Sequence, residues 1–206
     1  MDKTRIAVLV SGGGTNLQAL IDAQKNGVLK SGEIVLVISN NAIAYALTRA
    51  AEAGIPALTV TKKDCGGQEP FEDALIAALE EHRIDLIVLA GFMSILSERF
   101  TSRFERRIIN VHPSLIPSFC GKGFYGLKVH EAALAYGVKV TGATVHFVNE
   151  IPDGGRIILQ KAVNILPDDT PQSLQKSVME RAEWVILPEA AELVSSQIQK
   201  EKEYRQ

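Results

Sequence analysis

Short apolar runs alternate with stretches of helical periodicity along the first 90 residues of the chain. The runs have the length and the nearly continuous apolar character of strands buried on both faces, and they lie at 5–10, 34–39, 57–60 and 85–89. The stretches between them space their apolar residues as amphipathic helices do, and they lie at 15–25, 42–53 and 70–82. This alternation predicts a parallel sheet with crossover helices and a Rossmann-like, mononucleotide-binding first half.

The second half of the chain changes character after a further strand at 107–111. A long irregular loop rich in proline and glycine follows at 113–126, and loops of this length in compact domains are usually functional or disordered. A helix is expected at 127–136, and the β-branched, alternating sequence at 139–149 indicates a long strand. A Pro-Asp-Gly-Gly turn then leads to a strand at 156–165, which predicts a hairpin.

The last expected element is a long helix that starts near Pro171, a residue suited to a first helical turn. We expect it to run through Glu192 and as far as Lys200, with a bend or pause around Pro188. The elements together predict an α/β fold in one domain, 1–206. Its mostly parallel, twisted sheet carries helices on both faces, and an antiparallel hairpin and a long helix lie at the C-terminal end.

Composition narrows the class of protein. Hydrophobic residues make up 46% of the chain and charged residues 22%, which is enough apolar material for a core and excludes a disordered chain. The 22 Lys and Arg residues against 24 Asp and Glu residues give a formal net charge of -2, which argues against a general nucleic-acid binder. We therefore expect a small molecule as the partner, with no nucleic acid.

The two cysteines, Cys65 and Cys120, lie far apart and outside any CxxC pair, so they predict reduced thiols and neither a disulfide framework nor a metal site. No apolar run approaches the 18 residues of a membrane span, and no cleavage site follows the first run. These features predict a cytoplasmic protein with no membrane partner.

A glycine-rich loop, Ser11–Asn16, lies between the first expected strand and the first expected helix. Glycines let the backbone approach an anion, and the free N–H groups at a helix N-terminus bind it. Leu17 stands where a dinucleotide fingerprint requires a third glycine, so a single phosphate suits the loop better than a dinucleotide. The alternative is a tight turn with an Asn or Thr cap.

Asn110 and His112 are two residues apart on one expected strand, so their side chains project to the same side near its carboxyl end. An amide and an imidazolium placed in this way could hold an oxyanion, and the imidazolium could transfer a proton. A carboxylate from Asp153 would favour the imidazolium and raise its pKa, if the turn folds back that far. A structural histidine and an ordinary Asp-Gly turn are the alternatives. His82, His130 and His146 are expected to be structural or surface residues.

Five ordered motifs carry a resemblance that covers essentially the whole chain: they are Ser11–Leu17, Leu89–Met93, Asn110–Leu115, Thr144–Val148 and Asp153–Gly155. In this order they resemble the folate-dependent phosphoribosylglycinamide formyltransferases of de novo purine (IMP) biosynthesis. The resemblance implies the formyltransferase fold, with a mononucleotide-binding half at 1–100 and a catalytic, folate-binding half at 101–206. It also implies formyl transfer from 10-formyltetrahydrofolate, as cosubstrate, to the amine of glycinamide ribonucleotide, with no metal or nicotinamide and with a monomer or homodimer.

The resemblance also implies the roles of particular residues. Asn110 and protonated His112 would stabilise the tetrahedral oxyanion, while Asp153 would hold His112 charged and help relay a proton through water. The remaining matches concern substrate binding: phosphate at Gly14, Thr15 and Asn16, ribose at Glu183, and folate at Met93, Ser94, Ile95, Leu96, Asn110 and Gln68. For Glu183 the alternative is a solvated charge on a helix.

This sequence departs from the family pattern at several positions that concern the folate. Ser94 stands where some members carry Arg, and Gln68 falls near a position where a basic contact to the folate tail is often found. The loop at 119–126 is longer than in some members, and Lys122 could reach a substrate from it. These changes bear on the affinity for folate polyglutamates.

Three other functions can be compared with this one. Formyltetrahydrofolate hydrolase, or another formyl-folate transferase of the same fold, would normally carry an extra domain. A non-catalytic sugar-phosphate sensor would have no need of the Asn110, His112 and Asp153 set. A nicotinamide dehydrogenase is rejected, because Ser39-Asn40-Asn41 stands where it requires an acidic residue.

Overall fold

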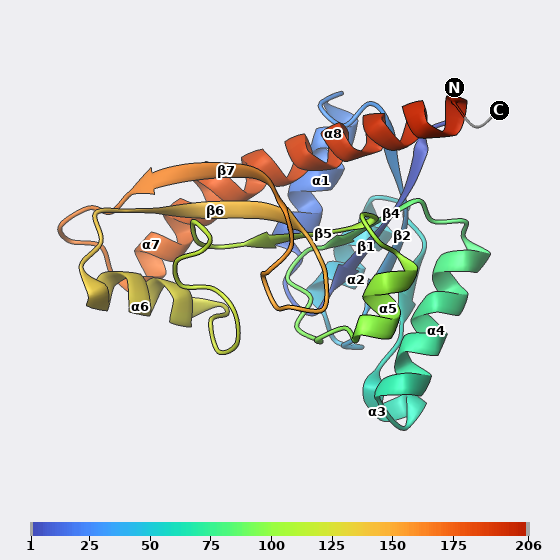
Figure 1. Ribbon diagram of the computed structural model, residues 1–206, viewed down its shortest axis with the longest axis horizontal. Coiled ribbons are helices and arrows are strands. Elements are labelled where there is room, and N and C mark those ends of the chain that lie inside the picture. Colours follow the sequence, from blue (N-terminus) through green and yellow to red (C-terminus); the bar gives the residue numbers. More distant parts are fainter. Residues whose placement is uncertain (1, 205–206) are drawn as a thin grey trace.

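A seven-stranded sheet forms the centre of the computed structural model, which describes residues 2–204 (Figure 1). Its spatial order is β3-β2-β1-β4-β5-β6-β7. The strands are β1 (Thr4–Val10), β2 (Gly32–Ser39), β3 (Ala57–Thr59), β4 (Leu86–Leu89), β5 (Ile108–His112), β6 (Val140–Phe147) and β7 (Ile157–Asn164). Neighbouring strands from β3 to β5 pair in parallel, whereas β6 and β7 pair antiparallel as a hairpin. The strand order reverses between β1 and β4, so the carboxyl ends of these two strands form a topological switch point.

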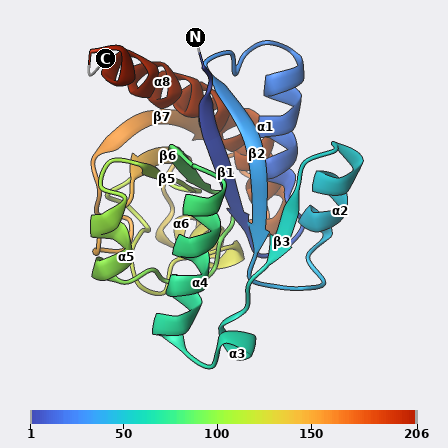
Figure 2. The same cartoon turned by 90° about the vertical axis from the view of Figure 1, so that its right-hand side faces the viewer.

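Helices cover both faces of the sheet (Figure 2). Their bounds are α1 (Thr15–Lys25), α2 (Tyr45–Glu52), α3 (Lys62–Cys65), α4 (Gln68–Glu81), α5 (Glu98–Arg103), α6 (Leu127–Tyr136), α7 (Pro171–Val178), the π-helical segment η1 (Met179–Glu183) and α8 (Trp184–Glu203). Figure 2 shows α1 and α2 on one side of β1 and β2, with α4 and α5 on the other side of the sheet. The predicted fold class, a mostly parallel sheet with helices on both faces and a terminal hairpin, is confirmed.

Two apolar cores result from the alternation of side chains along the strands. Ile6, Val8 and Val10 of β1 belong to a core that α1, α2, α7 and α8 complete. Ala7 and Leu9 of the same strand belong to a second core, which α4 and α5 complete from the opposite face. The near-continuous apolar sequence of β1 is therefore needed because both of its faces are buried.

Helix α8 returns along the sheet to the first strand (Figure 1). The hydroxyl of Thr4 in β1 donates to the carbonyl of Ser195 over 2.8 Å, and Glu192 accepts from the N–H and the hydroxyl of Ser31, each over 2.8 Å. Lys202 pairs with Asp85 at 2.7 Å, just ahead of β4. Helix α8 therefore packs against β1 and completes the core to which Ile6, Val8 and Val10 belong.

Several element boundaries differ from those predicted. Helix α2 begins at Tyr45 rather than at 42, because Asn41 forms a turn in which its carbonyl accepts from Ala44 N–H. The short helices α3 and α5 were not predicted, since four and six residues are too few to show a helical period. Their N-terminal side-chain caps, Thr61 and Ser97, were the available signals.

The predicted pause around Pro188 is wrong in position. Pro188 lies inside α8, and the irregular segment is the π-helix η1, Met179–Glu183, ahead of it. A proline ring crowds the carbonyl four residues earlier and leaves it without its helical donor, so the distortion falls on the N-terminal side of the proline. The helix itself continues to Glu203, past the expected end at Lys200.

None of the helices within residues 2–204 combines the length and the apolar character needed to cross a membrane.

Candidate active site

Four segments meet at the carboxyl ends of the parallel strands. They are the glycine loop after β1, the residues after β4, the end of β5 and the turn between β6 and β7. Ligands of open α/β sheets bind at this edge, outside a switch point.

Asn110 and His112 lie on β5 as the alternation predicted, and the turn at Asp153 folds back to them. His112 is only 4% exposed, and its Nδ1 lies 3.4 Å from Oδ2 of Asp153. Asp153 has a φ of 57°, a left-handed conformation that aspartate tolerates better than most residues and that is often found at functional sites. The structure thus brings all three residues of the predicted set together.

His146 belongs to this site as well, which the sequence interpretation missed. It lies opposite Asn110 across the β5–β6 ladder, and its Nε2 is 3.2 Å from Nδ2 of Asn110 and 3.6 Å from Oδ1 of Asp153. Its Nδ1 lies 2.8 Å from the carbonyl of Phe147. The expectation that His146 is only a structural or surface residue is therefore incomplete. The available signal was its place on the strand that pairs with β5, where cross-strand partners share a face.

The 113–126 loop contacts both His112 and Asp153. The carbonyl of Phe119 lies 2.9 Å from Nε2 of His112, and a carbonyl can only accept, so Nε2 carries a proton. The N–H of Gly121 donates to Oδ2 of Asp153 over 2.8 Å. With Nε2 protonated and Nδ1 facing a carboxylate, the geometry around His112 suits an imidazolium.

Burial opposes that charge. Desolvation lowers the pKa of His112, and the nearby His146 adds to this, whereas Asp153 and the Phe119 carbonyl act in the opposite direction without overcoming it. Asp153 therefore acts to raise the pKa of His112 as expected, but burial outweighs it and the net direction is downward. Burial also acts to raise the pKa of Asp153, but His146, His112 and the N–H of Gly121 together hold it below its usual value, so Asp153 is ionised.

The glycine loop forms the second part of the site. Gly14 precedes α1 with a φ of 71°, and a Cβ there would lie 2.7 Å from Cβ of Ala46, so only glycine fits. In the part of the chain that the structure describes, no side chain caps the start of α1, so its first N–H groups have no side-chain acceptor there. The alternative of a turn closed by an Asn or Thr cap is not what the structure has.

Glu183 lies beside this loop rather than in solvent. It is 7% exposed, and its Oε2 accepts a 2.7 Å hydrogen bond from Nδ2 of Asn16. Burial raises the pKa of Glu183, and the bond from Asn16 acts against that rise. The wide turn of η1 carries this carboxylate, and π-helical turns are frequent at functional sites.

A cleft of about 130 Å³ opens between the segment after β4 and the β6–β7 turn. Its lining comprises Leu89, Phe92, Ser94, Ile95, Leu96, Asn110, His146, Val148, Asn149, Glu150, Ile151, Pro152 and Asp153. Three residues of the predicted folate segment 93–96 thus line it, while Met93 instead donates its N–H to the Ser11 hydroxyl over 2.8 Å. Asn110 and Asp153 of the predicted catalytic set both belong to this lining.

Gln68 lies behind this cleft and not in its lining. Its Nε2 donates to Oε1 of Glu72 over 2.5 Å and to the carbonyl of Ile95 over 3.1 Å. Glu72 is 1% exposed and also accepts from the N–H of Ser97 over 2.7 Å. Both side chains therefore anchor the 93–97 segment from α4.

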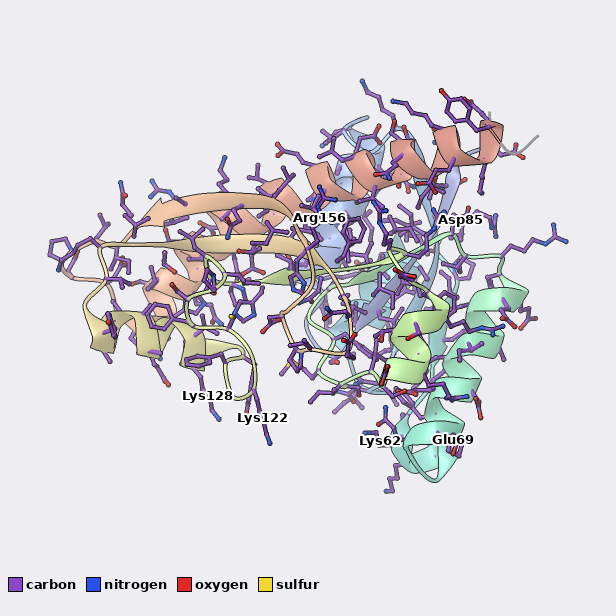
Figure 3. The ribbon with its side chains drawn as sticks, in the orientation of Figure 1. Lys62, Glu69, Asp85, Lys122, Lys128 and Arg156 are labelled. Atoms are coloured by element: carbon purple, nitrogen blue, oxygen red, sulfur yellow. The ribbon has the colours of Figure 1, made fainter. Side chains whose placement is uncertain are left out.

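Lys122, the other residue expected to reach a substrate, projects away from the body of the molecule beside Lys128 (Figure 3). The Nζ of Lys128 lies 3.0 Å from the hydroxyl of Tyr125 in the same loop.

An open α/β sheet with an Asn–His–Asp set and a glycine loop at its carboxyl edge places the chain in the class of open α/β proteins, whose ligands bind at that edge. Comparison with known proteins then identifies the family. Residues 4–191 match the family described as formyl transferase, and the chain belongs to it.

The chain is also similar to individual proteins whose names include this activity. The chain is 44% identical over 184 residues to phosphoribosylglycinamide formyltransferase of Haemophilus influenzae, covering 89% of this chain and 84% of that one. It is 46% identical over 195 residues to the trifunctional purine biosynthetic protein adenosine-3 of Gallus gallus, covering 95% of this chain but only 19% of that protein's length. The structure of glycinamide ribonucleotide transformylase 1 from Symbiobacterium toebii superimposes with a TM-score of 0.88 at 41% identity, over 95% of this chain and 89% of that one.

Proposed function

We propose that the protein transfers the formyl group of 10-formyltetrahydrofolate to the amine of glycinamide ribonucleotide, giving formylglycinamide ribonucleotide and tetrahydrofolate. The observation that carries this proposal is that Asn110 and Asp153 line a cleft, that His112 lies 3.4 Å from Asp153, and that the start of α1 carries no side-chain cap. Such a site can hold a folate, a phosphate and a developing oxyanion at once. The Haemophilus influenzae relative, named for this reaction, supports it.

The first step is attack by the neutral amine on the formyl carbon, which places a negative charge on the formyl oxygen. Asn110 has a second amide N–H besides the one directed at His146. Protonated His112 is the other donor, once the oxyanion replaces the Phe119 carbonyl as the acceptor from its Nε2–H. The new negative charge and the Asp153 carboxylate both favour the imidazolium, which offsets the burial that lowers the pKa of His112.

The second step breaks the bond between the formyl carbon and the folate nitrogen. The attacking nitrogen loses one proton and the leaving nitrogen gains one, so the reaction needs a proton relay but no net proton. Asp153, ionised and 3.4 Å from His112, accepts a proton through water and passes it on, while His112 remains charged.

The substrates occupy the two parts of the site described above. The phosphate lies against the N–H groups of Gly14, Thr15 and Asn16, and the ribose hydroxyls lie against Glu183. The pterin enters the cleft along Ser94–Leu96, with Asn110 in the same lining, while Met93 holds this segment to the glycine loop. Gln68 acts on the folate through the segment that it anchors.

A three-cuvette assay tests the proposal. The purified protein is mixed with glycinamide ribonucleotide and 10-formyldideazafolate, and the absorbance of the deformylated product is followed. A second cuvette omits the ribonucleotide, and a third contains the His112→Ala variant. The proposal expects deformylation only in the first cuvette.

Two other outcomes would each replace the proposal. Deformylation without the ribonucleotide would identify a formyltetrahydrofolate hydrolase of this fold. No deformylation in any cuvette, with ribonucleotide binding still detected by calorimetry, would identify a sugar-phosphate sensor.

A further inference from the structure

Consecutive carbonyls of the glycine loop are all held by hydrogen bonds. The carbonyl of Ser11 accepts from Nδ2 of Asn41 over 3.2 Å, and that of Gly12 accepts from the N–H of Ala46 over 3.0 Å. The carbonyl of Gly13 accepts from Nε of Arg49 over 2.9 Å. Each of these donors lies in α2 or in the turn that leads to it. The carbonyl of Gly14 is held by the helix itself, through Gln18 N–H over 2.9 Å.

These bonds decide where the N–H groups of the loop point. In a trans peptide unit the C=O of one residue and the N–H of the next point in opposite directions. Carbonyls of 11, 12 and 13 that face α2 therefore turn the N–H groups of 12, 13 and 14 away from α2. Within residues 2–204 none of these three N–H groups donates a hydrogen bond. They form a row of free donors, the arrangement that binds anions.

Arg49 is fixed well enough to control one of these peptide units. Besides its bond to Gly13, it donates from Nη1 to Oε1 of Gln18 over 3.0 Å, and its guanidinium lies 5.1 Å from the centre of the Tyr45 ring. The side chain therefore bridges α2, the loop and α1. The peptide unit that it holds, Gly13–Gly14, carries the N–H of Gly14, one of the residues assigned to the phosphate.

We propose that Arg49 is a positioning residue for the substrate phosphate, acting through the Gly13 carbonyl. Its Nε–H orients the Gly13–Gly14 peptide so that Gly14 N–H faces the phosphate, and the charge of the guanidinium is secondary. This inference rests on the proposed function for the identity of the anion.

Three substitutions separate the hydrogen bond from the charge. Arg49→Gln places an amide N–H at the same number of bonds from Cα as Nε, and it removes the charge. Arg49→Lys keeps the charge but places a methylene where Nε stands. Arg49→Ala removes both. Arg103→Gln is the matched control, because Arg103 pairs with Glu80 on the surface between α5 and α4, away from the loop.

The measurements are KM for glycinamide ribonucleotide, KM for 10-formyldideazafolate, calorimetric binding of the ribonucleotide, and kcat/KM for the phosphate-free glycinamide riboside. In Arg49→Lys and Arg49→Ala, KM and Kd for the ribonucleotide rise about tenfold, while Arg49→Gln restores both to within about threefold of the wild type. The folate KM, the riboside kcat/KM and the Arg103→Gln variant stay at wild-type values, since none of them involves the phosphate contact.

Other results overturn the inference. A normal Arg49→Lys with a defective Arg49→Gln would assign a direct charge contact with the phosphate, and normal KM and Kd in all variants would leave Arg49 without a role. A loss of equal size with the riboside would indicate a general structural defect. If the wild-type protein binds the ribonucleotide but transfers no formyl group, the proposed function fails and the Kd series still tests Arg49. If it does not bind the ribonucleotide, both proposals fail.

Discussion

The side-chain amide of Asn16 donates a 2.7 Å hydrogen bond to the carboxylate of Glu183, across 167 positions of sequence. Both side chains are more than nine-tenths buried, at 8% and 7% exposure. The bond joins the start of α1 to the π-helical turn η1, so the phosphate and ribose parts of the candidate site are one connected unit.

This connection predicts that substitutions at the two positions are not additive. Asn16→Ala removes the donor that opposes the burial-raised pKa of Glu183, and Glu183→Gln removes the acceptor charge. Each substitution raises KM for glycinamide ribonucleotide. In the double variant the combined effect is smaller than the sum of the two single effects by about 1 kcal/mol, as for residues in one network. A double-mutant cycle on KM, with melting temperatures as the stability control, measures this. Strict additivity would show that the two residues act separately.

His112→Ala and Asp153→Asn are expected to lose most turnover while both substrates still bind. In the proposed mechanism His112 donates to the oxyanion and Asp153 relays the proton, so each loss affects the transition state more than the ground state. We expect kcat to fall about 10²–10⁴-fold in either variant, with little change in the Kd of the ribonucleotide. Steady-state kinetics and calorimetry check this, and wild-type turnover in either variant would remove the role assigned to that residue.

The pKa of His112 should fall further in Asp153→Asn. Burial already lowers this pKa, and the Asp153 carboxylate is a main influence acting to raise it. The asparagine removes that influence while keeping the shape of the side chain, so the imidazolium form is lost at a lower pH than in the wild-type protein. Titration of the His112 ring signals by NMR measures the shift, with His82, near the end of α4, as the internal reference. An unchanged or raised pKa would contradict the pairing.

A buried histidine outside the proposed mechanism sets part of the acid stability. His130 in α6 is fully buried, and its two ring nitrogens have no hydrogen-bond partner within residues 2–204. Burial lowers its pKa to about 4. The unfolded chain therefore binds more protons than the folded one between about pH 4 and pH 6.5, and stability is lost as the pH falls through that window.

His130→Leu is expected to remove this dependence. When the pH is lowered from 7.5 to 5, the histidine is expected to reduce the free energy of unfolding by about 2 kcal/mol. Leucine binds no proton, so it makes no such contribution. Because the ring nitrogens make no hydrogen bonds, the apolar replacement leaves no partner unsatisfied. Urea unfolding of both proteins at the two pH values measures the difference, and His82→Leu serves as the control. An equal acid loss in the wild type and in His130→Leu would contradict the assignment.

Gln68→Ala should weaken formyl-folate binding by the same factor for mono- and polyglutamate forms. Gln68 donates its amide to Ile95 and Glu72 and thus positions the cleft segment, without a side-chain group directed at a glutamate tail. We expect KM for the folate to rise a few-fold, as on loss of about one hydrogen bond. Comparing KM across tail lengths is the measurement. An effect that grows with tail length would instead place Gln68 in contact with the tail.

Much of the fold could be predicted, because buried strands and amphipathic helices have periods that the sequence displays directly. Helices α1 and α6 have the predicted bounds, and the hairpin has the predicted position. Short elements such as α3 escape this approach, since one turn shows no period. The position of η1 was not predicted, because a proline indicates that a helix is distorted but does not indicate which helical turn is distorted.

The site was predictable where one element carries its residues. Asn110 and His112 follow from the alternation of a single strand, whereas the approach of Asp153 depends on how far the β6–β7 turn folds back. His146 required knowledge of which strand pairs with β5, and that pairing is antiparallel within an otherwise parallel sheet. Contacts between segments that are remote in sequence, such as Glu183 with Asn16, are set by tertiary packing that no local period reveals.

The return of α8 to β1 also bears on how a newly made chain can fold. Thr4, Ser31 and Asp85 have their partners in α8, so the apolar face of the first strands stays open until α8 has been synthesised. Synthesis runs from the N-terminus at about 5–20 residues per second, which leaves that face without its last helix for about ten seconds or more. Those seconds are the interval in which a chaperone that recognises apolar surface has its target.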